Sequence, residues 1–171
     1  NSKLKIRNVG LNPTRIGFYK LLKEHGAKII FKNVKKKNNE AIGDIYISSS
    51  KIRKIKDTKY YYVNSTDEYP ILFVIAALIK GTSVFKGVKD RANKESNRIK
   101  EMQKILKQLN VNSLFAKDDI KIFGKGLFSA EKKRILVPKL GDHRICMSSF
   151  ILSILTGANT KIKNFETVNT S

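Results

Sequence analysis

The chain repeats a pattern at intervals of about 78 residues, and such a repeat restricts the possible folds more than any single motif does. Residues 20–31 align without a gap with residues 104–115. Both segments have a helical pattern that passes through a Gly or an Asn into a strand-like pattern. Further upstream, residues 4–9 and 83–88 share the alternation of a half-buried strand, and residues 160–165 show it a third time. We therefore expect three copies of one unit, of which the third is cut short.

Two continuously apolar segments belong to the same repeat. Residues 71–79 and 145–155 each follow an aspartate, Asp67 or Asp142, and each precedes one of the repeated strands. A helix that is apolar on all sides is buried, whereas an amphipathic helix covers the face of a sheet. We predict one α/β domain over residues 1–171, with buried apolar helices surrounded by sheets. The N-termini of these helices would face a common mouth.

The chain is also strongly basic, with 35 Lys and Arg against 14 Asp and Glu and a formal net charge of +21. This balance suggests nucleic acid as a partner, but a coding bias toward Lys, Asn and Ile explains it as well. The densest basic run, residues 35–39, contains no aromatic residue and is typical of a solvated turn. Only the cluster Tyr60, Tyr61 and Tyr62 offers candidates for base stacking, so we expect no nucleic-acid partner.

The single cysteine, Cys146, excludes an internal disulfide and a cysteine-based metal cluster. It lies on the apolar side of its helix, where we expect a buried, unreactive thiol. No signal peptide opens the chain, and residues 71–79 are too few to span a bilayer. We therefore expect a cytoplasmic protein with no membrane contact. The first residue is Asn rather than Met and the last residues stop in mid-pattern, which indicates an excised piece of a longer protein.

Three short charged runs stand at the starts of predicted helices. A helix N-terminus carries a partial positive charge, so a cation placed there strengthens the binding of a small anion. Carboxylates in the same place suit proton transfer on a bound polyanion. The residues that carry this prediction are Asp67, Lys94, Glu95, Arg98, Asp142, His143 and Arg144.

Five of these seven residues have a plainer interpretation. The pattern alone favours Asp67 and Asp142 as helix N-caps that each contribute about 1 kcal/mol. Glu95 and Arg98, three positions apart, are typical of a surface ion pair worth about 0.3 kcal/mol. His143 alone is typical of a partly buried polar residue. The residue pattern by itself leaves both interpretations open.

Four runs, residues 11–15, 67–70, 94–98 and 141–144, resemble in order and spacing the C-terminal half of the enolpyruvylshikimate-phosphate synthases. The resemblance covers nearly the whole chain. It implies one domain of a two-domain fold in which each domain contains three βαβαββ units and the substrates lie between the domains. It also implies transfer of the carboxyvinyl group of phosphoenolpyruvate to the 5-hydroxyl of shikimate 3-phosphate, with release of phosphate, on the way to chorismate and the aromatic amino acids.

The same resemblance implies that no metal or organic cofactor takes part, and that a monomer needs the missing N-terminal domain of its own chain. It assigns a role to each candidate residue. Asp67 resembles the proton acceptor near the target hydroxyl, and Glu95 the acid and base at the methylene carbon. Arg98 and Arg144 resemble the pair that binds the phosphoenolpyruvate carboxylate, and His143 resembles the histidine beside them. Lys94 resembles a lysine that contacts both the shikimate phosphate and the reacting oxygen.

Two positions depart from the family pattern, which usually has an Arg where this chain has Ala92 and an Asp where it has Asn97. A sister family transfers the same carboxyvinyl group to UDP-N-acetylglucosamine and shares the fold. Its motifs differ, and the run at residues 94–98 argues against it. That transferase and a basic nucleic-acid-binding module are the two alternatives.

Overall fold

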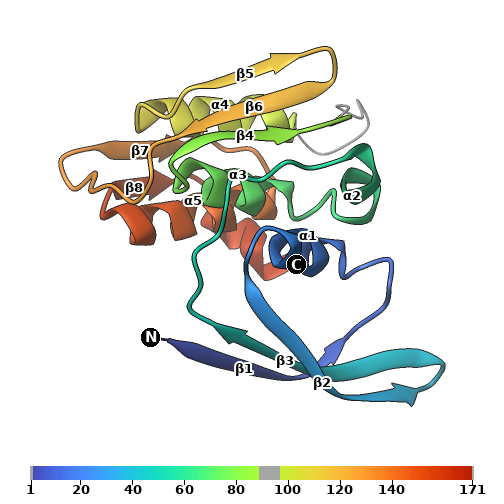
Figure 1. The fold of residues 1–171 in the computed structure, drawn as a ribbon. Helices are drawn as coiled ribbons and strands as arrows, with labels where there is room; N and C mark the ends of the chain where they lie inside the picture. The colour runs from blue at the N-terminus through green and yellow to red at the C-terminus, as the bar shows by residue number, and fades with distance from the viewer. Residues whose placement is uncertain (1, 89–96, 171) are drawn as a thin grey trace.

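The structure is a computed structural model that describes residues 2–88 and 97–170 (Figure 1). Strands and helices follow one another in a mixed order along the chain. They are β1 (Lys3–Gly10), α1 (Gly17–Glu24), β2 (Lys28–Lys37), β3 (Glu40–Ser48), α2 (Lys59–Asn64), α3 (Tyr69–Ala77), β4 (Gly81–Phe85), α4 (Arg98–Gln108), β5 (Ser113–Ala116), β6 (Asp119–Gly124), β7 (Arg134–Val137), α5 (His143–Thr156), β8 (Asn159–Ile162) and the 3-10 helix η1 (Phe165–Thr170).

Two sheets have the same topology. In the first, β1 and β2 both pair antiparallel with β3, which gives the order β1-β3-β2. In the second, β4 and β5 both pair antiparallel with β6, which gives the order β4-β6-β5. In each unit the amphipathic helix, α1 or α4, lies in the chain between the first and second strands. The sequence repeat is thus a repeat of three-dimensional structure.

Successive units are joined by parallel pairing. After β6, the chain forms β7, which pairs in parallel with β8 of the next unit. At the matching place after β3, Lys56 forms a parallel bridge with Val84 of β4, supported by hydrogen bonds from Asp57 N to Val84 O and from Val84 N to Ile55 O. The sequence did not predict β7, because only four residues form it and its partner strand lies in another unit.

The apolar helix α3 is buried, as predicted. Phe73 packs edge-on against Phe85 of β4, and both side chains are almost fully enclosed. Tyr69, the first residue of α3, packs edge-on against the same two rings. This aromatic group joins α3 to the second sheet, so the start of α3 has a fixed place.

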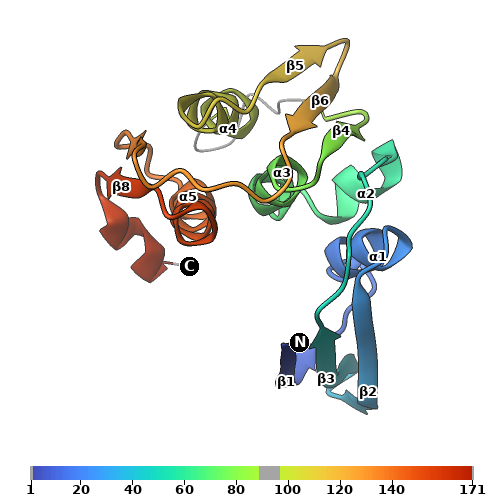
Figure 2. The same ribbon diagram turned by 60° about the vertical axis from the view of Figure 1, so that its left-hand side comes forward.

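The prediction that both apolar helices are surrounded by sheets needs a correction for α5. Its inner side is buried, but its outer side exposes large apolar residues with exposed fractions from 36% to 61%. The sheet of β1, β3 and β2 lies against α1, away from α5 (Figure 2), so within the described residues it does not cover this side. The exposed residues are Met147, Phe150, Ile151, Ile154 and Leu155.

The tyrosine cluster lies on α2, a short helix that the sequence analysis did not predict. Tyr61 is buried and its hydroxyl donates a hydrogen bond to Glu24 at the end of α1. Tyr60 is exposed and packs edge-on against Tyr61. Tyr61 therefore contributes to the packing between α1 and α2, which leaves it unable to stack on a nucleic-acid base.

Candidate functional site

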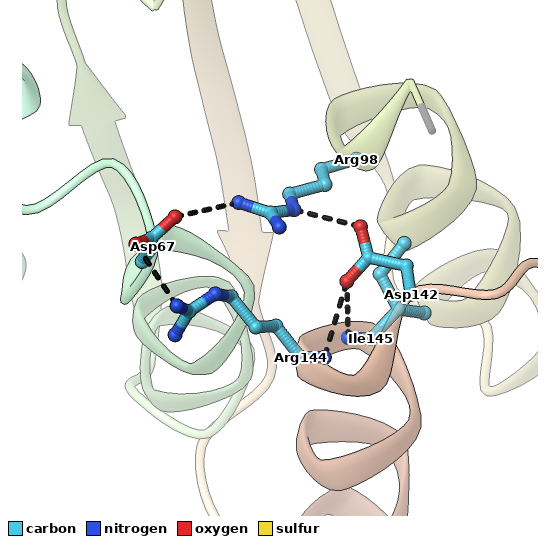
Figure 3. Close-up of polar contacts among 5 residues, drawn as sticks. All are labelled: Asp67, Arg98, Asp142, Arg144 and Ile145. Atoms are coloured by element: carbon cyan, nitrogen blue, oxygen red, sulfur yellow. Dashed lines mark hydrogen bonds and ion pairs between the residues drawn. The ribbon is translucent and has the colours of Figure 1, made fainter. Parts of the chain in front are cut away.

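The starts of three helices meet at one cluster of charged side chains (Figure 3). Arg98 is the first residue of α4, Arg144 is the second residue of α5, and Asp67 lies just before α3. Arg98 Nη1 donates to Asp67 Oδ1 over 2.9 Å, and Arg144 Nη2 lies 2.9 Å from Asp67 Oδ2. The common mouth that the sequence predicted for its helix starts is therefore present, and it brings together three of the six residues to which the resemblance gave a role.

Asp142 completes this cluster and has two functions in it. It is the N-cap residue of α5, and its Oδ1 accepts hydrogen bonds from the backbone N–H groups of Arg144 and Ile145. Its other oxygen, Oδ2, accepts a hydrogen bond of 2.7 Å from Arg98 Nε. The capping interpretation of Asp142 is confirmed, but the same carboxylate also orients Arg98. The sequence signal for this second function is the aspartate at the helix start, in the same charged run as Arg144.

Asp67 does not cap its helix. The N-cap position of α3 belongs to Glu68, whose side chain makes no capping hydrogen bond. The capping interpretation of Asp67 is therefore wrong, because its two carboxylate oxygens each bind a guanidinium group instead. A carboxylate with one cation on each oxygen makes strong, charge-assisted hydrogen bonds.

The two arginines differ in how they are held. Arg98 is mostly enclosed, with 12% of its side chain exposed, and it lies between two carboxylates. Burial by itself would lower the pKa of Arg98, but the hydrogen bonds that Arg98 donates to Asp142 and Asp67 outweigh burial and raise it. Arg144 is more open, yet its Nε is buried and has no hydrogen-bond partner within residues 2–88 and 97–170. One donor of Arg144 is therefore buried and unsatisfied within the described residues.

The other predicted site residues are placed less completely. His143 is the first residue of α5, half-buried, between Asp142 and Arg144 in the chain. Lys94 and Glu95 lie outside the described residues, as does Ala92.

Asn97, which departs from the family pattern, acts as the N-cap of α4. Its side chain accepts a hydrogen bond of 2.9 Å from the backbone N–H of Lys100. Asn and Asp are about equally good N-cap residues, so this departure leaves the start of α4, and therefore Arg98, in place.

A polar pocket of about 190 Å³ adjoins the cluster on the side of Asp67. It adds a third cation, Arg15, which the sequence analysis did not propose as a site residue although residues 11–15 belong to the run that carries the resemblance. Burial raises the pKa of Glu68 in this pocket, and Asp67 raises it further, whereas Arg144 and Arg15 act in the opposite direction. The pocket is lined by Thr14, Arg15, Asn64, Ser65, Thr66, Asp67 and Glu68.

Arg15 is presented by a turn and not by a helix. Asn12 Oδ1 accepts hydrogen bonds from both the backbone N–H and the hydroxyl of Thr14, which is the geometry of an Asx turn. Helix α1 begins only at Gly17. Because these hydrogen bonds hold the turn together, Arg15 has a defined position next to the start of α3.

Across residues 2–88 and 97–170, no three His, Cys, Asp or Glu side chains gather in a way that would hold a metal ion. In the same part of the chain, every helix is too short or too polar to cross a membrane.

The fold and the site together define an α/β domain of repeated strand and helix units with an arginine–carboxylate cluster where its helices begin. A family model described as EPSP synthase (3-phosphoshikimate 1-carboxyvinyltransferase) matches residues 1–171. The chain belongs to this family, as the resemblance in sequence predicted.

Individual relatives agree with this assignment. The chain is 34% identical over 171 residues to a 3-phosphoshikimate 1-carboxyvinyltransferase of Thermoanaerobacter pseudethanolicus. This alignment covers 100% of this chain and 40% of that protein. The chain is 36% identical over 171 residues to one of Petrotoga mobilis, with 100% and 39% covered. A structure of EPSP synthase from Acinetobacter baumannii superimposes with a TM-score of 0.83 at 31% identity and covers 98% of this chain and 39% of that one. The chain thus spans about two fifths of the length of these relatives.

Proposed function

We propose that this chain is part of an enzyme that transfers the carboxyvinyl group of phosphoenolpyruvate to the 5-hydroxyl of shikimate 3-phosphate, with release of phosphate. One observation carries the proposal beyond family membership: Arg98 and Arg144 approach from two helix starts and bind a single carboxylate between them. Phosphoenolpyruvate is a small anion with a carboxylate of its own. Planar guanidinium groups bind a carboxylate better than the ammonium group of Lys does.

The reaction needs two proton transfers. The acceptor hydroxyl must lose its proton while the methylene carbon of phosphoenolpyruvate gains one, and elimination of phosphate then reverses the step at carbon. A carboxylate near each place can carry its proton. We assign the hydroxyl proton to Asp67 and the proton at carbon to Glu95, with Lys94 and His143 as further contacts to the substrates. The arginine–carboxylate cluster supports this assignment, since it places Asp67 beside the arginine pair.

The proposal also concerns the rest of the protein. We propose that residues 1–171 form one part of a domain built from three copies of the unit, and that a second, N-terminal domain closes over the substrates. Closure would exclude water and strengthen the charged contacts. A monomeric state, a cytoplasmic location, the absence of a cofactor and the absence of a nucleic-acid partner belong to the same proposal. The contact of Tyr61 on α2 with Glu24 at the end of α1 supports the last of these.

Phosphate release by the full-length protein tests the proposal. We expect release only when phosphoenolpyruvate and shikimate 3-phosphate are both present. Release with UDP-N-acetylglucosamine in place of shikimate 3-phosphate would show that the sister activity is the correct one. Nonspecific affinity for nucleic acid falls on the order of a thousandfold between about 0.05 M and about 0.2 M salt. Binding of RNA or DNA oligonucleotides that persists at about 0.2 M salt or above would therefore favour the nucleic-acid alternative.

A further inference from the structure

Asp67 occupies the arginine pair in the way that a substrate carboxylate would. Its Oδ1 binds Arg98 Nη1 and its Oδ2 binds Arg144 Nη2, each over 2.9 Å. Under the proposed function, however, the arginine pair has to bind the carboxylate of phosphoenolpyruvate. The two carboxylates therefore compete for the same donors.

The competition also concerns the chemistry of Asp67. A carboxylate that is paired with two cations is a weaker proton acceptor than one that is not, because the cations stabilise its charged form. As long as Asp67 bridges the two arginines, it is poorly suited to take a proton from a hydroxyl group. Its bridging position and its proposed catalytic role thus belong to two different states of the site.

The unsatisfied Nε of Arg144 points to the edge of the guanidinium group that a second carboxylate would bind. In a guanidinium group, Nε and Nη2 lie on the same edge and together bind a carboxylate through two parallel hydrogen bonds. Nε of Arg144 is buried without a partner, while Nη2 is bound to Asp67. A ligand carboxylate that binds this edge would satisfy Nε and would compete with Asp67 for Nη2.

Asp142 is held much more firmly than Asp67. It has no exposed surface, it caps α5 through Oδ1, and it holds Arg98 by Nε, on the edge away from Asp67. Asp67 lies in the segment before α3 with 26% of its side chain exposed. A ligand can therefore replace Asp67 while Asp142 keeps Arg98 in place.

We infer that Asp67 is an internal ligand of the arginine pair, that the carboxylate of phosphoenolpyruvate displaces it, and that this displacement makes Asp67 available to accept the proton of the acceptor hydroxyl. The inference rests on the proposed function and adds an order of events to it. The proton acceptor becomes active only after phosphoenolpyruvate has bound. Asp142 acts as a positioning residue, because it keeps Arg98 oriented in both states.

Calorimetric titration of the full-length protein with phosphoenolpyruvate tests this exchange, with two matched variants that each remove one negative charge beside Arg98. Asp67→Asn removes the competitor, so we expect binding at least threefold tighter than in the wild type. Asp142→Asn removes the support of Arg98, so we expect binding at least threefold weaker. Equal tightening in both variants would reveal a general charge effect and would overturn the inference, as would unchanged or weaker binding by Asp67→Asn. Failure of the wild type to bind phosphoenolpyruvate would instead overturn the proposed function, and this inference with it.

A structure of the wild-type protein with phosphoenolpyruvate provides a test that needs no substitution. We expect both contacts of Asp67 to the arginines to open beyond the range of an ion pair, with the Arg98–Asp142 contact retained. A complex in which the ligand carboxylate is bound while Asp67 still bridges both arginines would rule the exchange out.

Discussion

Arg98 Nε lies 2.7 Å from Oδ2 of Asp142, a carboxylate with no exposed surface. This contact joins the first turn of α4 to the first turn of α5. Taking both charges out of water is costly, and the cost is met only while each charge has its partner. The pair therefore fixes the relative position of two helix starts, and with it the place of Arg98 in the site.

Replacing Asp142 should destabilise the protein more than most single substitutions. Asp142→Ala removes a helix cap worth about 1 kcal/mol and leaves the mostly enclosed Arg98 with one carboxylate fewer, which typically costs about 3 kcal/mol or more. We expect a loss of about 4 kcal/mol in the free energy of unfolding, measured by urea denaturation of the full-length protein. Glu40→Ala, at an exposed strand end, is the control and should stay within about 0.5 kcal/mol of the wild type. A change of similar size in both variants would contradict the assigned importance of the buried pair.

The arginine pair gives a prediction about kinetics. Arg144→Lys keeps the charge but loses the planar edge that binds a carboxylate through two hydrogen bonds. In the full-length protein, we expect the KM for phosphoenolpyruvate to rise about tenfold, which corresponds to about 1.4 kcal/mol, with a smaller change in the KM for shikimate 3-phosphate. Arg134→Lys, on β7 and exposed, is the matched control and should behave like the wild type. An unchanged KM for phosphoenolpyruvate in Arg144→Lys would argue against the carboxylate-binding role.

Much of this site could be anticipated from sequence because its residues lie at helix starts. The apolar pattern of residues 71–79 and 145–155 places those starts, and the repeat places them near one another. The pattern could not show that Asp67 binds the arginines, because that contact depends on side-chain direction across three helices. For the same reason it missed Arg15, which a turn brings to the pocket.

In the fold, too, local sequence patterns predict the elements, whereas the contacts between distant segments cannot be read from them. The two sheets follow from local alternation of apolar and polar residues, so their strands could be predicted. Helix α5, like α3, has apolar residues on all of its sides, yet only its inner side is buried. Periodicity reports the character of a helix and not which neighbours cover it. Likewise β7 has only four residues, and its assignment depends on pairing with β8.

The isolated piece should be catalytically silent. It spans about two fifths of the length of its relatives, and under the proposed function the remaining substrate contacts come from the second domain. We expect no phosphate release from purified residues 1–171 under conditions where the full-length protein turns over. Far-ultraviolet circular dichroism of the piece should show its helices, which would establish that the lack of turnover is not caused by unfolding. Turnover by the folded piece would refute the need for a second domain.

Asp57 predicts a dependence of stability on pH. Its side chain is 2% exposed, Tyr69 donates a hydrogen bond to Oδ2, and Oδ1 has no hydrogen-bond partner within the described residues. Burial raises the pKa of Asp57 from 3.8 to about 6, although the hydrogen bonds from Tyr69 and from the backbone N–H of Thr58 oppose the rise. The folded protein therefore holds this proton more tightly than the unfolded chain does.

The sign of the effect follows from linkage between protonation and folding. Because the folded-state pKa of Asp57 is the higher one, its contribution to stability is complete below pH 3.8 and is lost as the pH rises through about 6. We expect Asp57→Asn, which cannot ionise, to gain about 1.4 kcal/mol relative to the wild type between pH 5 and pH 7.5. Urea denaturation at both pH values measures this relative change, with Glu40→Ala as the control for other carboxylates. A stability difference between Asp57→Asn and the wild type that is the same at pH 5 and pH 7.5 would show that Asp57 does not titrate in this range.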